Sequence, residues 1–415
     1  MSTDNNEKKP QLRMLAPEGF REKISRRAFL QGGTALAGFA LVASACGSSD
    51  SGNTDGATNG GNELLASGDW SRVINQSSGT LAMYTWGDYN DPELVGALAA
   101  STLSVTMKVD YYASNEDLIT KLATSGGASG FDIVVPTGPY IPQMIEKGLI
   151  QKLDKTKIPN MSNVDPNYLA QAWDTTNDYS VCKNWGTTGY FYDSSKISKE
   201  LTTWQDFIDT CMGEASGNCA VIDAAPNYCG MWFWANGINW NTEKAEDLDA
   251  CEKFLVDEFA QHIKAFDSYP STKLAEGAYS IAMAWNGDAR QAYSRIEEAG
   301  GDPTVWKWVL GAPNTELWMD NYCVAAGAPN ADAAHAWINW DLIPEVSIKD
   351  LSYHGYHTGM KNMPTLISEI APDLVKGEMI FFGDDQVKTM QTQVITPALD
   401  RLIDILNKSK AKAGG

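Results

Sequence analysis

From Thr80 onward, short β-rich runs alternate with segments that have helical spacing. Thr80–Trp86 (TLAMYTW) and Ser104–Tyr112 (SVTMKVDYY) are strand-like, and Phe131–Pro136 (FDIVVP) is a short, continuous apolar run. The helical segments that separate and follow them are Pro92–Ala100, Glu116–Thr124 and Ile141–Lys147. Strand, helix, strand, helix, strand is the pattern of a parallel sheet covered by helices on both faces. The sequence therefore predicts an α/β fold.

A second α/β set follows later in the chain. Its strand-like runs are Ala220–Asp223 and Tyr279–Trp285, and its helical segments are Pro226–Ala235, Asp288–Ala299 and Thr396–Lys410. Two sets of this size predict two lobes that face a cleft. In open α/β sheets, ligands bind beyond the carboxyl ends of the strands.

Three of the apolar runs end in a tryptophan with an aspartate two or three residues later. These are Trp86–Tyr89 (WGDY), Trp285–Asp288 (WNGD) and Trp318–Asp320 (WMD). One such pair alone is typical of a packing Trp with a capping Asp. Three at equivalent places predict a site for an organic cation, because an aromatic face attracts an ammonium group and a carboxylate accepts its N–H bonds.

The charge of the chain agrees with a cationic ligand. There are 52 Asp and Glu residues against 32 Lys and Arg residues, a net charge of −20. Residues 1–45 hold seven of the basic and four of the acidic residues, so the rest of the chain has a net charge of −23. Such acidity argues against nucleic acid, whose phosphates need basic side chains.

The pattern of the first residues predicts an export signal followed by a tether. Arg26 and Arg27 precede a mildly apolar run of about 18 residues, which is short for a membrane-spanning helix. The pattern resembles a twin-arginine signal over residues 1–45. Ala43–Cys46 looks like a lipobox, which predicts a lipid on Cys46, although Ala43 keeps ordinary signal cleavage open. Residues 46–79 then form a flexible tether rich in Gly, Ser, Asn and Asp.

The chain is similar to the periplasmic putrescine/spermidine-binding proteins of ABC importers over most of Thr80–Lys410. Besides the Trp–Asp motifs, the matching segments are residues 131–136 (FDIVVP), 148–155 (GLIQKLDK), 163–166 (NVDP) and 177–181 (NDYSV). The resemblance implies a two-lobed, hinged periplasmic binding protein that closes on one polyamine. It further implies a monomer without cofactor or metal, held at the outer face of the cytoplasmic membrane, that serves ABC permease and ATPase subunits.

The resemblance also assigns ligand-binding roles. The amine-contacting residues of the family fall on the aromatics Trp86, Tyr89, Trp285 and Trp318, the carboxylates Asp88, Asp288 and Asp320, the hydroxyl of Thr137, and Tyr356 in a Gly-Tyr turn. Ala224 and Asn227 stand where the spermidine binders place two carboxylates. A buried third ammonium would then lack a partner, so the sequence predicts a preference for a short diamine over spermidine.

The family further implies discontinuous lobes. We expect lobe one to comprise residues 80–185 and 320–362, and lobe two residues 186–319 and 363–415, with crossover strands near Val181–Tyr192 and Trp318–Ala325. The six cysteines beyond Cys46 are an even number in an exported chain, which favours disulfides. The expected pairs are Cys211–Cys219, Cys182–Cys323 and Cys229–Cys251, unless these residues pack as small apolar groups.

The sequence argues against one other class of function and leaves a second one open. An enzyme is not predicted, because the sequence has no Gly-x-Ser-x-Gly, no glycine-rich phosphate loop and no His-Glu-x-x-His. His354 and His357 are expected to be surface histidines at a glycine turn rather than metal ligands. The same fold with another solute is the second alternative. An amino acid or opine would recruit an arginine, for which Arg290 is the candidate, whereas a betaine-type cation would need only the aromatics.

Overall fold

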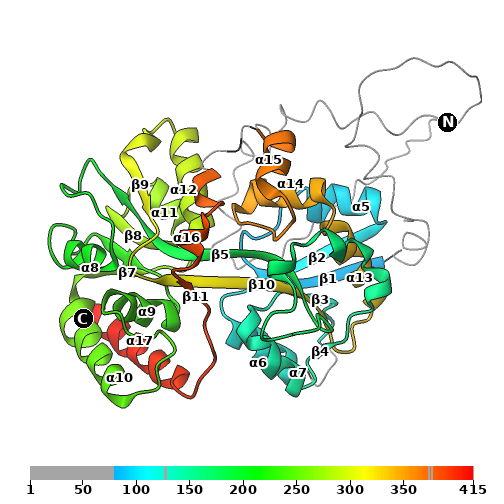
Figure 1. The fold of residues 1–415 in the computed structure, drawn as a ribbon, viewed down its shortest axis with the longest axis horizontal. Helices are drawn as coiled ribbons and strands as arrows, with labels where there is room; N and C mark the ends of the chain where they lie inside the picture. Colours follow the sequence, from blue (N-terminus) through cyan, green and yellow to red (C-terminus); the bar gives the residue numbers. More distant parts are fainter. Residues whose placement is uncertain (1–78, 126–128, 373, 375–376, 415) are drawn as a thin grey trace, which may run out of the picture.

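The computed structural model describes residues 79–125, 129–372, 374 and 377–414 (Figure 1). The predicted export signal, the lipid on Cys46 and nearly all of the tether lie outside these residues. Within the described part of the chain, no helix is long and apolar enough to cross a membrane.

One continuous path of strands runs through the molecule, in the order β2-β1-β3-β10-β5-β8-β6-β7. The pairs β1–β2, β1–β3, β6–β7 and β6–β8 are parallel, and the central pair β5–β10 is antiparallel. The strands are β1 (Gly79–Trp86), β2 (Val105–Tyr112), β3 (Ile133–Val134), β4 (Ile150–Gln151), β5 (Val181–Asp193), β6 (Cys219–Val221), β7 (Ile263–Phe266), β8 (Ile281–Trp285), β9 (Trp306–Val309), β10 (Thr315–Ala325) and β11 (Met390–Gln391). The predicted α/β fold is confirmed.

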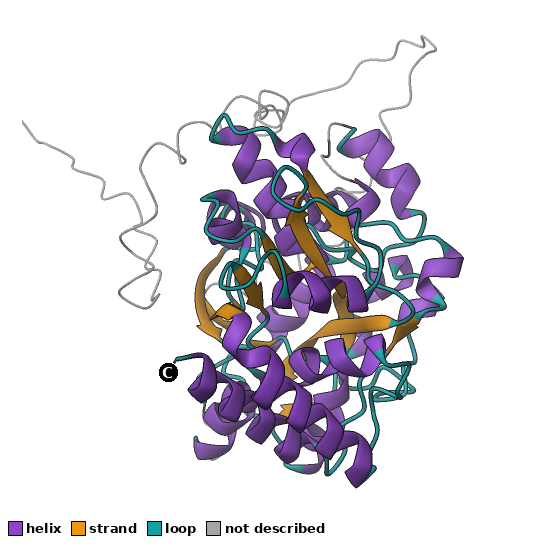
Figure 2. Ribbon diagram, turned by 90° about the vertical axis from the view of Figure 1, so that its left-hand side faces the viewer, coloured by secondary structure: helices purple, strands orange, loops and turns teal. Residues whose placement is uncertain are grey.

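Helices surround these strands, as Figure 2 shows from the side. They are α5 (Ala99–Thr102), α6 (Asn115–Thr124), α7 (Ile141–Glu146), α8 (Trp204–Met212), α9 (Ala225–Ala235), α10 (Ala245–Glu252), α11 (Ser271–Ala275), α12 (Asn286–Glu298), α13 (Ala331–Asp341), α14 (Pro344–His354), α15 (Met363–Ile370), α16 (Asp384–Val387) and α17 (Leu399–Ala413). Helix α6 illustrates the local logic. The side chain of Ser114 accepts the Asp117 N–H and caps its start, and Leu118 and Leu122 form its buried face.

Two large apolar cores divide the molecule into two lobes. One contains Leu81 and Val105 of the β1–β2 pair and Trp337 of α13. The other contains Val221 of β6 and Ile405 of α17. Strands β5 and β10 run from one lobe into the other along the middle of Figure 1, as expected for crossover strands. A hinge between the lobes would therefore have to bend these two paired strands.

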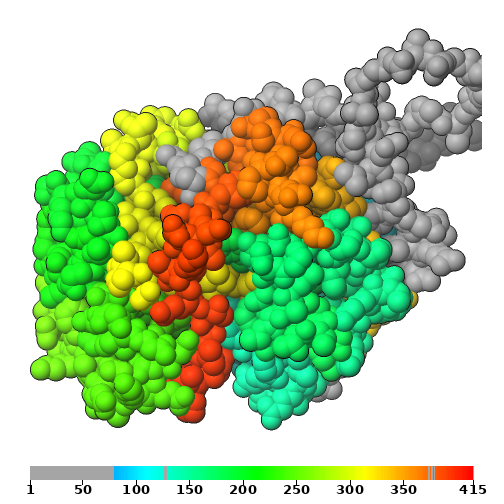
Figure 3. Space-filling view, in the orientation of Figure 1, coloured from blue at the N-terminus to red at the C-terminus, as the bar shows by residue number. Residues whose placement is uncertain are grey.

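The contacts of helices α15 and α17 bear on where the C-terminal part of the chain returns to the second lobe. Met363 and Ile367 of α15, together with Ile380, pack in the first core, and α15 lies beside α14 in Figure 1. Helix α17 packs on α9 and belongs to the second core. We therefore propose that the return follows Ile380. Figure 3 shows the red C-terminal residues along the seam between the two halves.

The three expected disulfides are absent, because all six cysteines in the described part of the chain are buried free thiols. The pairing of Cys182 with Cys323 is wrong for a plain reason: the two side chains pack in different apolar clusters. The thiols of Cys211 and Cys219 do meet and share a hydrogen bond. The six cysteines therefore pack as small apolar groups.

The expectation that His354 and His357 are surface histidines is also wrong. The side chain of His354 is fully buried, and its Nδ1 accepts the Tyr356 N–H at 3.0 Å. The Nδ1 of His357 accepts the Trp185 indole N–H at 2.9 Å. Burial lowers the pKa of His354 well below its usual range and that of His357 to about 4, so both are neutral packing groups. Among the described residues, no cluster of three or more His, Cys, Asp or Glu could hold a metal ion.

Candidate functional site

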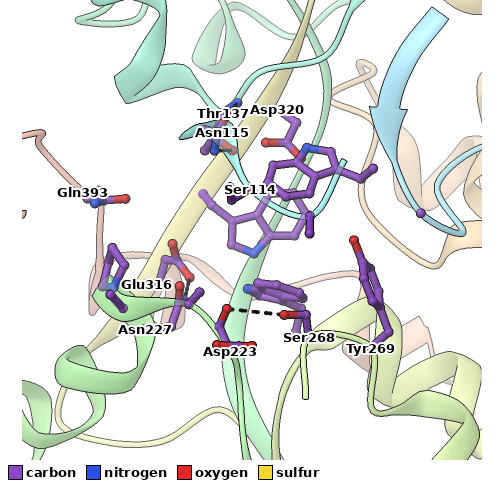
Figure 4. A pocket seen from close by; sticks show the side chains of 18 of the residues that line it. Ser114, Asn115, Thr137, Asp223, Asn227, Ser268, Tyr269, Glu316, Asp320 and Gln393 are labelled. Atoms are coloured by element: carbon purple, nitrogen blue, oxygen red, sulfur yellow. Dashed lines mark hydrogen bonds between the residues drawn. The ribbon is translucent and has the colours of Figure 1, made fainter. Parts of the chain in front are cut away.

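A cavity of about 350 Å³ lies where the lobes meet (Figure 4). All nine residues assigned from the sequence line it: Trp86, Asp88, Tyr89, Thr137, Trp285, Asp288, Trp318, Asp320 and Tyr356. They come from the ends of β1 and β8, the segment after β3, the start of α12, strand β10 and the loop after α14. The structure thus brings together in one place residues that lie up to 270 positions apart in sequence.

Strand geometry explains why these side chains converge. Strand β1 ends at Trp86 and β8 ends at Trp285, so the chain leaves the sheet at the cavity in both places. In β10, successive side chains point to opposite faces, so residues two apart share a face. Glu316, Trp318 and Asp320 therefore form one row along β10, and all three line the cavity.

Asp320 has one carboxylate oxygen held by the protein and one left without a partner. The Tyr89 hydroxyl donates to Oδ2 at 2.5 Å, whereas Oδ1 is buried and accepts no hydrogen bond from any described residue. Next to it, Thr137 and Asn115 exchange two hydrogen bonds of 3.0 Å, which fixes the threonine. Burial raises the pKa of Asp320 to about 6. An ammonium group would donate a hydrogen bond to Oδ1 and would bring a positive charge to pair with the carboxylate.

Asp288 is built in a similar way. The Tyr356 hydroxyl donates to its Oδ2 at 2.8 Å, and the Tyr356 ring meets the Trp318 ring edge to face, with centroids 4.8 Å apart. Burial raises the pKa of Asp288 to about 7. Asp88 differs, because it is partly exposed and lies 3.7 Å from the guanidinium of Arg295. Asp88 is thus a rim residue, and Asp288 an interior one.

Glu316 is a third buried carboxylate of the cavity, and our sequence reasoning missed it. The Thr188 hydroxyl donates to its Oε2 at 2.5 Å, and the Asn227 amide donates to the same oxygen. Burial raises its pKa to about 7. The two-residue alternation from Glu316 through Trp318 to Asp320 was the signal that could have identified it.

Other polar residues that line the cavity were not assigned to the site either. The Tyr140 hydroxyl donates to Glu116 at 2.8 Å, and Asp223 forms an ion pair with Lys410 at the surface. The remaining polar side chains are Ser114, Asn115, Asn227, Ser268, Tyr269, Gln291 and Gln393. Most of these come from turns and helix starts, where a polar residue is equally typical of a cap.

The charge balance of the cavity is one-sided. Six carboxylates line it, those of Asp88, Glu116, Asp223, Asp288, Glu316 and Asp320, and no described Lys or Arg side chain does. The arginine considered for an anionic ligand, Arg290, is instead buried against α14, where it donates to the Ser352 carbonyl at 3.3 Å. The site therefore favours cations and disfavours a ligand whose own carboxylate must be bound.

Comparison with known proteins agrees with this arrangement. Residues 93–375 match the family of bacterial extracellular solute-binding proteins, which is more than half of the chain. The chain belongs to this family. Its members are the solute-binding proteins of ABC transporters, so the chain is a solute-binding protein and not an enzyme.

Several members of the family resemble the chain over most of its length. The spermidine/putrescine-binding periplasmic protein of Escherichia coli is 30% identical over 323 residues, which cover 76% of this chain and 86% of that protein. The putrescine-binding periplasmic protein of Escherichia coli is 27% identical over 335 residues, 78% of this chain and 89% of that protein. The solved structure of a putative spermidine/putrescine ABC transporter from Listeria monocytogenes superposes with a TM-score of 0.71 at 26% identity, covering 80% and 98% of the two chains.

Proposed function

We propose that this solute-binding protein captures a putrescine-like polyamine and delivers it to an ABC permease that is driven by its ATPase subunits. The observation that carries the proposal is the cavity in which six carboxylates and three tryptophans meet without a lysine or arginine from the described part of the chain. An ammonium over an indole face gains about 0.5–2 kcal/mol, and carboxylates accept its N–H bonds strongly. The named relatives that bind spermidine or putrescine support the same ligand class.

The residues proposed to contact the ligand are the nine assigned from the sequence, all of which line the cavity. Oδ1 of Asp320 would accept from one terminal ammonium, and the faces of Trp86, Trp285 and Trp318 would enclose the methylene chain. We further propose that the protein acts as a monomer, exported and held at the outer face of the cytoplasmic membrane by a lipid on Cys46.

Titration calorimetry with a panel of ligands tests this function. Putrescine, spermidine, an amino acid such as glutamate, an opine and glycine betaine should be added in turn to the purified protein. We expect binding of the polyamines alone, because the acidic lining of the cavity would repel a ligand carboxylate. Binding of glutamate or the opine in preference to the polyamines would contradict the proposal, and tight betaine binding alone would favour a quaternary cation instead.

Binding should strengthen as the pH rises from 5 to 8. In the empty cavity, burial raises the pKa of Asp288 and Glu316 to about 7 and that of Asp320 to about 6. A protonated carboxyl cannot pair with an ammonium, so the ligand must displace these protons. Each displaced proton changes the affinity by up to about tenfold per pH unit below the pKa. Calorimetry in buffers of different ionisation enthalpy should show proton release on binding near pH 6.5.

The same groups should affect the stability of the ligand-free protein in the opposite sense. Between about pH 4 and 7 the folded protein binds more protons at these three sites than the unfolded chain does. The free energy of unfolding that they contribute therefore falls as the pH rises. Thermal unfolding at pH 5 and pH 8, with and without putrescine, checks whether this contribution to stability falls as the pH rises. An affinity that does not change over this range would contradict the pKa assignments.

A further inference from the structure

Glu316 stands apart from the other two buried carboxylates. Figure 4 shows it beside Asn227 at one side of the cavity, whereas Asp320 lies beside Thr137 and Asn115 at another. Both acids belong to β10 and point to the same face of the strand. Four residues at about 3.4 Å per residue place their Cα atoms about 14 Å apart. Trp318 lies between them on the same face.

Glu316 is held in place by neutral donors alone. Thr188 and Asn227 both donate to its Oε2, and they also join each other through a bond of 3.0 Å. Only 6% of the residue is exposed, and none of the ion pairs among the described residues involves it. A buried carboxyl group without a cation nearby is costly to ionise, so a cationic group is the partner that would complete this arrangement.

We propose that Glu316 is a ligand-binding carboxylate that accepts the second terminal ammonium of a polyamine of triamine length, whose first ammonium is bound by Asp320. This inference rests on the proposed function and adds to it the length of the ligand. With C–C and C–N bonds of about 1.5 Å, the end nitrogens of an extended four-carbon diamine are about 6 Å apart, and those of spermidine about 11 Å. With charge-assisted hydrogen bonds of about 2.8 Å at each end, extended spermidine covers a separation as long as that between the two Cα atoms, whereas the diamine falls short of it.

The position of Glu316 also bears on Ala224 and Asn227, which stand where the spermidine binders have carboxylates. The expected preference for a short diamine followed from the two missing carboxylates at Ala224 and Asn227. In the structure, the Asn227 amide donates to Glu316, so a carboxylate is present one hydrogen bond away, supplied by β10 instead of α9. On this proposal the site accepts a cation longer than the short diamine that the sequence predicted.

The test compares ligands of different length in matched variants. Calorimetry with putrescine, 1,8-diaminooctane and spermidine should be run on the unsubstituted protein and on Glu316→Gln. We expect Glu316→Gln to weaken spermidine and the eight-carbon diamine by about 10- to 150-fold, the range for a lost charged hydrogen bond. Putrescine affinity should change less than about threefold. Glu243→Gln, at an exposed acid, is the control for the loss of one charge.

A charge swap separates a binding role from a structural one. In the double variant Glu316→Gln with Asn227→Asp, acid and amide exchange places across the same hydrogen bond. Spermidine affinity should recover to within about tenfold of the unsubstituted protein, while thermal unfolding checks that each variant is folded. Undiminished spermidine binding by Glu316→Gln, an equal loss for putrescine, or failure of the swap to restore binding would overturn the inference. Putrescine binding by the unsubstituted protein in those cases would leave the proposed function standing.

Discussion

Replacing Asp320 with asparagine is expected to weaken polyamine binding by about 1.5–3 kcal/mol, roughly 10- to 150-fold in dissociation constant. Among the described carboxylates that line the cavity, Asp320 has a buried oxygen without a hydrogen-bond donor, while Tyr89 fixes its other oxygen. Asparagine keeps the shape and an acceptor for Tyr89, but it removes the charge that pairs with the ammonium group. The loss should therefore appear for short and long polyamines alike, in contrast to the length-dependent effect at Glu316.

Stability provides the internal check on the Asp320 variant. Because burial already raises the pKa of Asp320, removing its charge should leave the melting temperature of the ligand-free protein unchanged or higher. Calorimetry at pH 8 measures the affinity, and Asp257→Asn, at an exposed acid, controls for net charge. Full polyamine affinity in Asp320→Asn would mean that the ligand does not use this carboxylate.

Lys183→Met should lower the free energy of unfolding by about 3–5 kcal/mol, the cost of leaving one partner of a buried ion pair unpaired. The Lys183 ammonium lies 2.9 Å from Asp350, and both side chains are at most 2% exposed. The same ammonium donates to the Tyr89 carbonyl at 3.0 Å and lies 4.6 Å from the centroid of its ring. Lys183 of the crossover strand β5 thus supports the tyrosine that contacts Asp320, so the variant should also bind polyamine less tightly.

A second substitution separates the lost pair from the lost packing. In Lys183→Met with Asp350→Asn, the buried charge is gone, and the asparagine oxygen still accepts the Asp91 N–H, which Asp350 accepts at 2.7 Å. Most of the stability should return, because replacing both charges of a buried pair is far less costly than removing one. Urea unfolding measures all three proteins. If the single and double variants were equally unstable, packing around the lysine stem would be the cause.

The local patterns of the sequence were sufficient for the class of fold. Alternating and continuous apolar runs predicted strands at Thr80–Trp86 and Tyr279–Trp285, and the structure has β1 and β8 there. The tryptophans and aspartates at the ends of the apolar runs predicted a shared site, because the carboxyl ends of neighbouring parallel strands lie at the same edge of a sheet. The residues around Trp86 and Trp285 line one cavity for that reason. Trp318 and Asp320 instead lie inside β10 and reach the cavity from one face of that strand. Family resemblance supplied Thr137 and Tyr356, for which no local pattern exists.

The sequence by itself determined the features that depend on residues close together in the chain, which are the strand and helix periods and the strand ends. Its composition determined the acidity of the chain. Tertiary structure alone decided where side chains distant in sequence meet. It placed Glu316 against Asn227, 89 residues away, and put Cys182 and Cys323 in different apolar clusters. It also buried His354 and His357, which a glycine turn had suggested were at the surface. The physical reason is that burial and pairing depend on contacts between segments that are far apart in the sequence, and a sequence pattern of a few residues does not contain those contacts.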